Sequence, residues 1–172
     1  MTLKRFLFLA MGLIISLTAT CDDAELFAYL CDSSGTPTNI RCAPNGAVAM
    51  TINSKESYML ELSNPINGWW QLEAIYDPVE DDAGIPLHGS KTGKYYIHYS
   101  IVGFSTRNYG QDYYLREYPS ENSKATFNFH DEILVHPIEM TNGWVKVKTS
   151  DMKHTGWIES EMICNNPLTT CP

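Results

Sequence analysis

The sequence predicts an all-β protein built from two small repeated units. No window of roughly 11 or more residues places apolar side chains at the i, i+3, i+4 and i+7 positions of an amphipathic helix. Short segments rich in β-branched and aromatic residues instead alternate with Gly, Pro, Asn and Ser, as strands joined by turns do. An internal repeat is the third observation, and it divides the chain into two modules.

The repeat has a constant offset of 75 residues. Arg41 and Pro44 return as Arg116 and Pro119. Residues 67–72 (NGWWQL) return as residues 142–147 (NGWVKV) without a gap. Fixed-period similarity of this kind indicates two copies of one structural unit. We therefore place the first copy at residues 24–106 and the second copy at residues 107–172.

The clearest strand patterns lie in both copies. Asn-Gly pairs at residues 45–46, 67–68 and 142–143 predict tight turns with positive φ angles between strands. The predicted strands are Ala47–Ile52, Tyr58–Leu62, Trp69–Tyr76, Tyr95–Val102, Ile133–Pro137, Trp144–Thr149 and Trp157–Ile163.

The first 20 residues have the features of a secretory signal peptide. Lys4 and Arg5 precede an apolar run from Phe6 to Leu17, and small residues follow at 18–20. The apolar run is shorter than the roughly 20 residues that a membrane-spanning helix needs. We expect cleavage and export, which places the protein in the periplasm or at the outer membrane.

Cys21 directly follows the signal segment and resembles the acylated cysteine of a bacterial lipoprotein. The acidic residues Asp22, Asp23 and Glu25 resemble the tag behind that cysteine in surface lipoproteins of the Bacteroides group. Residues 17–20 depart from the usual lipoprotein pattern, so ordinary signal-peptide cleavage after Ala19 or Thr20, without acylation, is the alternative. Lipidation would anchor the protein to a membrane, and we expect no other membrane contact.

Four cysteines remain if Cys21 is acylated, and an even number fits disulfide pairing in an oxidising compartment. The spacing suggests one bond around the loop between Cys31 and Cys42, and another that holds the C-terminal tail through Cys164 and Cys171. The alternative is a metal site, but no C-x-x-C pair is present and no His lies two to five residues from a cysteine. We expect no metal and no cofactor.

The charge balance excludes one class of partner. The chain has 20 acidic against 12 basic residues, a formal charge of −8. Such a surface repels phosphate backbones, so nucleic acid is not an expected partner.

The first copy contains an acidic insertion. Tyr96 corresponds to Trp157 at an offset of 61, so the first copy has 14 additional residues, at about Asp77–Ser90. This segment reads as a surface loop, either decorative or functional.

Three motifs in order, present in both copies, resemble the bacterial SH3-like (SH3b) domain. They are Asn39-Ile40-Arg41 with Pro44, Asn67-Gly68-Trp69 and Tyr96-Ile97 in the first copy, and Leu115-Arg116 with Pro119, Asn142-Gly143-Trp144 and Gly156-Trp157-Ile158 in the second. The first copy has Tyr95 where the last motif has glycine, and the second lacks the first Asn. The resemblance implies two tandem small SH3-like β-barrels that bind a ligand, in some members a peptidoglycan peptide, without catalysis.

Strand alternation predicts which aromatic side chains face outward. In residues 144–147, Val145 and Val147 share the inward face, which leaves Trp144 and Lys146 outside. The same register turns Trp70 and Leu72 inward and leaves Trp69 outside. An outward Trp in each copy is a candidate ligand platform, or else a cover for the barrel rim or for the interface between copies. The candidate ligand-binding residues are Trp69, Trp144, Tyr96, His98 and Trp157.

Enzyme signatures are absent from the sequence. The five histidines and the cysteines form no nucleophile and base pattern, and there is no zinc-binding H-E-x-x-H, phosphate loop or G-x-S-x-G elbow. We expect a non-catalytic cell-envelope protein that recognises peptidoglycan or a wall-associated ligand. The alternative is a protein–protein interaction module such as an inhibitor, immunity or scaffold protein, with the acidic insertion contacting a basic partner.

Overall fold

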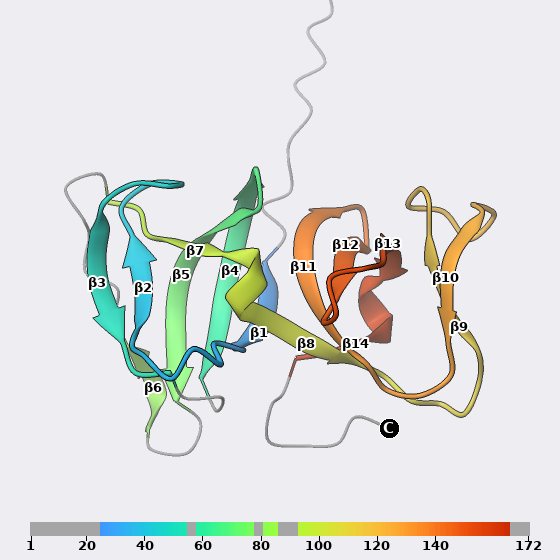
Figure 1. The fold of residues 1–172 in the computed structure, drawn as a ribbon, viewed down its shortest axis with the longest axis horizontal. Coiled ribbons are helices and arrows are strands. Elements are labelled where there is room, and N and C mark those ends of the chain that lie inside the picture. Colours follow the sequence, from blue (N-terminus) through green and yellow to red (C-terminus); the bar gives the residue numbers. More distant parts are fainter. Residues whose placement is uncertain (1–24, 55–57, 78–80, 86–92, 166–172) are drawn as a thin grey trace, which may run out of the picture.

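The computed structural model describes residues 25–54, 58–77, 81–85 and 93–165 (Figure 1). Three predictions lie outside these ranges or depend on residues outside them. They are the signal peptide, the acylation of Cys21 and the tail disulfide between Cys164 and Cys171. The described cysteine of that disulfide, Cys164, is buried on the last strand, β14. Its pairing with Cys171 therefore stays a prediction.

The described residues form strands connected by turns and two short 3-10 helices, which confirms the all-β class. The bounds are β1 Leu26–Leu30, β2 Thr38–Arg41, β3 Val48–Ile52, β4 Met59–Ile66, β5 Trp69–Asp77, β6 Asp81–Ile85, β7 Tyr96–His98, η1 Tyr99–Ile101, β8 Val102–Thr106, β9 Tyr113–Arg116, β10 Ala125–Phe129, β11 Leu134–Thr141, β12 Trp144–Thr149, β13 Thr155–Glu159, η2 Ser160–Met162 and β14 Ile163–Cys164.

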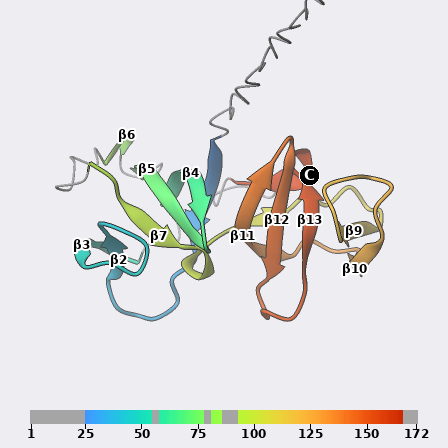
Figure 2. The same cartoon turned by 90° about the horizontal axis from the view of Figure 1, so that it is seen from above.

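Within the described residues the strands join into one antiparallel sheet rather than two separately closed barrels. The order of hydrogen-bonded neighbours runs β10-β9-β13-β12-β11-β8-β1-β4-β5-β7-β2-β3, with β14 on β8 and β6 on β5. Figures 1 and 2 show the strands of the two copies as two groups side by side. The sheet is continuous because one strand, β8, pairs with strands of both copies.

Strand β8 is the last strand of the first copy and the first strand of the second. It pairs with β1 through Leu30 and Val102, and with β11 through Val135 and Phe104. In Figure 1 it runs from one group of strands into the other. A boundary between residues 106 and 107 therefore separates the second copy from a strand that it uses.

Backbone hydrogen bonds show the same arrangement on both sides of β8. The N–H of Cys31, after β1, donates to the carbonyl of Ile101 at 2.8 Å, and the N–H of Arg107, after β8, donates to the carbonyl of Met162 at 2.8 Å. Strand β14 thus lies against β8 as β8 lies against β1. The two copies therefore repeat this backbone contact, although the residues that make it do not correspond at the 75-residue offset.

Two predicted strands are interrupted. The segment predicted as Tyr95–Val102 contains β7, the 3-10 turn η1 and the start of β8. The His98 side chain caps η1 by accepting from the Ser100 N–H at 3.4 Å. The corresponding segment, predicted as Trp157–Ile163, is divided in the same way by η2. The short helix redirects the chain, so an uninterrupted strand was the wrong expectation at both places.

The acidic insertion contains a strand where a loop was expected. Residues Asp81–Ile85 form β6, which pairs with β5 through Ile75 and Ile85. The backbone of this acidic segment is therefore held at an edge of the first copy's sheet.

The Asn-Gly turns between long strands match the prediction. Asn67 and Gly68 have φ of 51° and 80°, and Asn142 and Gly143 have φ of 43° and 79°. Two successive positive φ angles suit the tight hairpins that join β4 to β5 and β11 to β12. Asn45 also has positive φ, at 55°.

The buried side chains of both copies form one hydrophobic cluster. Val145 and Val147 in the second copy are fully buried, as are Trp70 and, nearly so, Leu72 in the first. The inward register predicted from alternation is therefore confirmed in both copies. Trp70 lies where the copies meet, because its indole N–H donates to the carbonyl of Pro137 on β11 at 2.8 Å.

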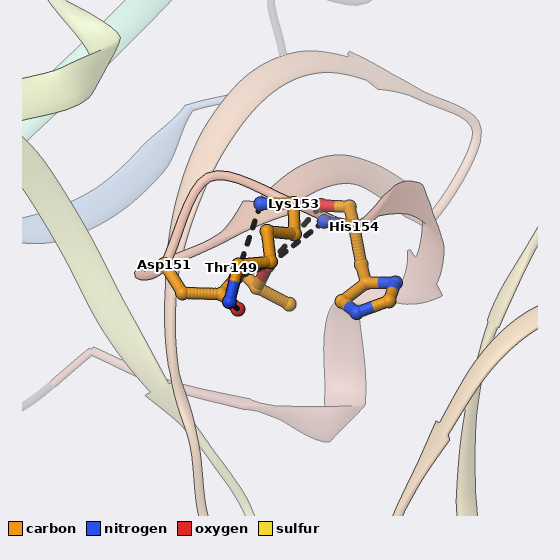
Figure 3. A network of polar contacts seen from close by, with 4 residues as sticks. All are labelled: Thr149, Asp151, Lys153 and His154. Carbon is orange, nitrogen blue, oxygen red and sulfur yellow. Dashed lines mark hydrogen bonds and ion pairs between the residues drawn. The ribbon is translucent and has the colours of Figure 1, made fainter.

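The turn between β12 and β13 is held by side chains (Figure 3). The Thr149 hydroxyl donates to Asp151 Oδ1 at 2.6 Å, and the Lys153 N–H donates to the same oxygen at 3.1 Å. These bonds lower the pKa of Asp151 to about 2, with the Thr149 bond as the largest favourable cause. The Thr149 N–H also donates to the His154 carbonyl at 3.0 Å, which sets the register of β13 on β12.

The expected disulfide between Cys31 and Cys42 is not formed. The Cys31 thiol donates to the Tyr29 carbonyl at 3.7 Å and the Cys42 thiol to the Ala47 carbonyl at 3.4 Å. The residues follow strands β1 and β2, which are separated in the sheet by β4, β5 and β7. Sequence spacing alone did not show this separation.

Candidate ligand groove of the second copy

Each copy presents five matched side chains on the outer face of three neighbouring strands. Register pairs place Trp69 opposite His98 and Gln71 opposite Tyr96 in the first copy. They place Trp144 opposite Glu159 and Lys146 opposite Trp157 in the second. Arg41 and Arg116 pair with Tyr96 and Trp157. The outer faces are thus Arg41, Trp69, Gln71, Tyr96 and His98 in one copy, and Arg116, Trp144, Lys146, Trp157 and Glu159 in the other.

The two arginines hold equivalent turns. Arg41 Nη1 donates to the Gly46 carbonyl at 2.6 Å, and Arg116 Nη1 donates to the Ser123 carbonyl at 2.9 Å. Each bond ties the end of a strand to the turn that follows it. Both arginines therefore have a structural role that follows directly from the repeat.

The outer face of the first copy is covered. Trp69 lies outside the hydrophobic cluster, as its register requires, yet it is only 8% exposed. The His98 ring lies edge-on to it at 5.0 Å, and the Arg41 guanidinium lies over it at 5.8 Å. Trp69 therefore faces outward as its register predicts but is covered by neighbouring side chains, which strand alternation does not show.

His98 is fixed in this covering position. Its ring contacts Tyr99 at 4.5 Å between centroids, and its Nδ1 lies 2.8 Å from the Ser100 hydroxyl. Burial lowers the pKa of His98, since a charged imidazole would lose hydration here. Within the first copy, His98 therefore has a structural role, since it packs against Trp69 and Tyr99 and caps η1.

The outer face of the second copy is open at one end. Trp144, the counterpart of Trp69, is half-buried and lines a cavity. Trp157 is 7% exposed and lies under the Lys146 ammonium, 5.6 Å from its ring centroid. Its counterpart Tyr96 is 8% exposed. Of the five candidates, the structure therefore places Trp144 against a described cavity and covers Trp69, Tyr96 and Trp157.

This cavity, which we call the groove, has a volume of about 280 Å³. It lies between the segment that leads into β9, the start of β12 and the end of β13. Its walls combine aromatic, charged and amide side chains. The lining residues are Gln111, Asp112, Tyr113, Tyr114, Arg116, Trp144, Ile158, Glu159 and Met162.

Tyr113 and Tyr114 have different roles in the groove. Tyr113 is buried, stacks on Phe129 at 5.5 Å and accepts a hydrogen bond from the Tyr109 N–H. Tyr114 is 41% exposed, and the Arg116 guanidinium lies 5.7 Å from its ring centroid. Tyr113 therefore fixes the wall, whereas Tyr114 presents an aromatic surface to solvent.

Carboxylates dominate the charge of the groove. Burial raises the pKa of Glu159, Glu121 and Glu161 raise it further, and Arg116 lowers it. Asp112 lies at the other side, 3.2 Å from Nδ1 of the exposed His130. The arrangement suits recognition of a small ligand group by charge and aromatic contact.

Sequence reasoning missed most of the groove. Tyr114 could have been assigned outward by alternation, since its neighbours Tyr113 and Leu115 are both buried. Glu159 occupies the position of His98 at the offset of 61 and was detectable by that comparison. Asp112 and Gln111 lie in an irregular segment with no pattern to single them out.

The described ranges contain neither a metal-binding cluster nor a membrane-spanning helix. Among those residues there is no group of three or more His, Cys, Asp or Glu side chains arranged to hold a metal ion. The helices present in the same ranges are too short or too polar to cross a membrane.

In the part of the chain that the structure describes, the fold and the groove define an all-β tandem-repeat protein whose second copy has an open outer face. Neither a family model nor a curated protein sequence matches the chain. Two solved structures from Trichomonas vaginalis are similar to it, NlpC1 at 10% identity and NlpC2 at 11% identity, each with a TM-score of 0.31. The alignments cover 89% and 83% of this chain, and the chain spans about half of each neighbour, 50% and 48%.

Proposed function

We propose that this protein is an exported, non-catalytic envelope-binding protein, and that the groove of its second copy holds a peptidoglycan-derived or other wall-associated ligand. The resemblance of the repeated motifs to bacterial SH3-like domains supports this class of protein. Acylation of Cys21 would hold the protein at a membrane that faces the wall.

One observation carries the choice of site. The same outward Trp occurs in both copies, but Trp69 is 8% exposed beneath His98, whereas Trp144 lines an open cavity. A ligand can contact Trp144 without moving any side chain that the fold uses. The protein is therefore expected to have one site rather than two equivalent ones, and binding through paired weak sites is not needed.

Co-sedimentation with purified peptidoglycan sacculi tests the proposal. Removing a central aromatic anchor typically weakens binding by at least tenfold, so we expect Trp144→Ala to stay largely in the supernatant. Tyr118→Ala is the matched control, because Tyr118 is an aromatic residue of the same copy that is 64% exposed and does not line the groove. The control should sediment like the wild type.

The same assay separates the other classes of function. A hydrolase would release soluble wall fragments during incubation, and we expect none. Failure of the wild type to sediment, or equal sedimentation of Trp144→Ala and Tyr118→Ala, would contradict the proposed site.

A protein-interaction role remains the second candidate because of β6. Its pairing with β5 holds the acidic segment Asp81–Ile85 as an ordered sheet edge. This role predicts salt-sensitive binding of one basic envelope protein, lost when residues 78–92 are replaced by a short turn. Sacculus binding would be unchanged by that replacement if the groove is the wall site.

A further inference from the structure

We propose that the groove of the second copy selects ligands that carry a primary ammonium group, and that the Glu159 carboxylate is the counter-charge. This inference rests on the proposed function, since it assigns the ligand chemistry of the same groove. Two kinds of wall component carry such a group: peptides with free amines, and glycan strands whose amino sugars lack the acetyl group.

Glu159 is a carboxylate without a close counter-charge in the described part of the chain, where Arg116 acts on it only at longer range. No hydrogen bond or ion pair joins its side chain to any residue in those ranges, although it is half-buried and lines the groove. A partly desolvated carboxylate is stabilised when a cation approaches it. A ligand ammonium at this position would supply that charge and donate hydrogen bonds to both oxygens.

The charges around the groove favour a cation over an anion. Asp112 and Glu159 line it, and Glu121 and Glu161 lie close enough to act on Glu159. Arg116 is the cationic lining residue, and its guanidinium is held by the Ser123 carbonyl and the Tyr114 ring. An anionic ligand would meet at least two carboxylates, whereas an ammonium would meet one guanidinium that is already bound.

The aromatic walls add to cation selectivity. Trp144 is half-buried and Tyr114 is 41% exposed, so both present ring surface to the groove. Rings of this kind attract an ammonium and also pack against the apolar part of a ligand. A neutral ligand of the same shape would keep the packing but leave Glu159 unpaired, and a site built this way rejects such ligands strongly.

The first copy provides an internal comparison. His98 stands where the second copy has Glu159, opposite the same Trp in the register. The imidazole packs onto Trp69 and covers it, whereas the carboxylate leaves Trp144 open. The face also differs between the copies at Gln71 and Lys146 and at Tyr96 and Trp157. The exchange of His98 for Glu159 is the difference that lies directly opposite the shared Trp, and it coincides with both the open cavity and its negative charge.

The experiment uses two probes, each with an acetylated twin. The peptide L-Ala-D-Glu-L-Lys and a tetramer of glucosamine carry free amines, while their fully N-acetylated forms have the same framework without the charge. Each is titrated into the ¹⁵N-labelled mature protein, and amide and indole shifts around Tyr114, Trp144 and Glu159 are followed. We expect at least one free-amine probe to bind, and its acetylated twin to bind at least tenfold more weakly.

Glu159→Gln and Glu161→Gln form the matched pair of variants. Both remove one negative charge from neighbouring positions, but Glu161 is exposed and does not line the groove. Glu159→Gln should weaken the free-amine probe by tenfold or more and bring it close to its acetylated twin. Glu161→Gln should stay within about twofold of the wild type, because it changes only the screened surface charge.

Several results would overturn the inference. They are equal binding of free and acetylated probes, equal effects of the two Glu variants, or no shifts from either free-amine probe up to 10 mM. If sacculi still sediment the wild type but not Trp144→Ala, the proposed function stands and only the ammonium specificity fails. If sacculi do not sediment the wild type, the proposed function fails separately.

Discussion

The indole N–H of Trp70 donates a 2.8 Å hydrogen bond to the carbonyl oxygen of Pro137, so a core residue of the first copy satisfies a backbone group of the second. Both residues are buried. The bond joins residues 67 positions apart, on β5 and β11, and so links the two copies in addition to the pairing of β8 with both. The two copies are therefore expected to unfold together.

Trp70→Phe tests this connection. The Pro137 carbonyl would lose its indole donor in a buried place, and such a group costs about 1–3 kcal/mol when unsatisfied, with a further loss from the smaller ring. Trp144→Phe is the control and should change the free energy of unfolding by about 0.5 kcal/mol or less. Denaturant titration measures both, and equal stability of the two variants would show that the Trp70 bond contributes nothing.

Expressing the second copy with and without β8 should show whether its folding requires that strand. A fragment of residues 107–172 lacks the partner strand of β11 and β14, whereas a fragment of residues 99–172 retains it. We expect the shorter fragment to give the collapsed amide spectrum of an unfolded chain and the longer one to give more dispersed signals. A dispersed spectrum from residues 107–172 would mean that the second copy folds without β8.

Gly156→Ala is predicted to destabilise the second copy. A Cβ at this position would lie 2.7 Å from Thr126 Oγ1, 2.8 Å from Leu115 Cβ and 2.9 Å from the Arg116 carbonyl oxygen. Because the obstruction includes backbone, β13 would have to shift, at a cost of about 1–3 kcal/mol. Thermal unfolding would measure the loss.

Gly110→Ala is the control for that substitution. Gly110 has a φ of 69° and no atom within 4 Å of an added Cβ, so its cost is conformational, about 1 kcal/mol. A Gly156→Ala variant no less stable than Gly110→Ala would argue against the close contact of β13 with β9 and β10.

His98 should make the first copy sensitive to acid. Its pKa is lowered by burial from the usual 6.5, so the folded state binds this proton less readily than the unfolded state. Stability associated with His98 is therefore present above pH 6.5 and is lost as the pH falls through 6.5 toward the lowered folded value.

His98→Gln should flatten this part of the stability profile between pH 7.5 and pH 5, measured by denaturant titration at each pH. His130→Gln is the control, because His130 is an exposed histidine of the second copy. An unchanged slope in His98→Gln would show that protonation of His98 is not coupled to folding.

Asp151 should contribute in a different pH range. Its pKa is lowered from 3.8 to about 2, chiefly by the Thr149 hydrogen bond. The stabilisation is therefore complete above pH 3.8 and disappears as the pH falls through about 2. Asp151→Asn should be less stable than the wild type at pH 7 and equal to it near pH 2. Asp131→Asn, at an exposed position in the β10–β11 turn, should show no such convergence.

Local patterns predicted the parts of the fold that depend on local chemistry. Alternation assigned Val145, Val147 and Trp70 to the core, because inward and outward positions follow from a strand's own period. Asn67-Gly68 and Asn142-Gly143 identified hairpins, because positive φ angles favour those residues.

Features that depend on distant partners were not predictable in the same way. Nothing in residues 102–106 shows that β8 pairs with strands on both sides, since partner choice is set by the whole chain. The covering of Trp69 depends on its contact with the His98 ring, and the groove depends on an irregular segment that ends at Tyr113. These side-chain relations determine the candidate site, so the site was less predictable than the fold.

The equivalence of β14 and β8 shows how a further copy of the repeat could be joined to the sheet. Each copy begins on the strand that completes the one before it, so a unit added after β14 would need no linker and would inherit a fixed angle and spacing. The outer faces of such an array point in directions set by the strand geometry rather than by a flexible hinge. In such a series one outer face can specialise while the framework of its neighbour stays unchanged, as the covered Trp69 and the open Trp144 already show within this pair.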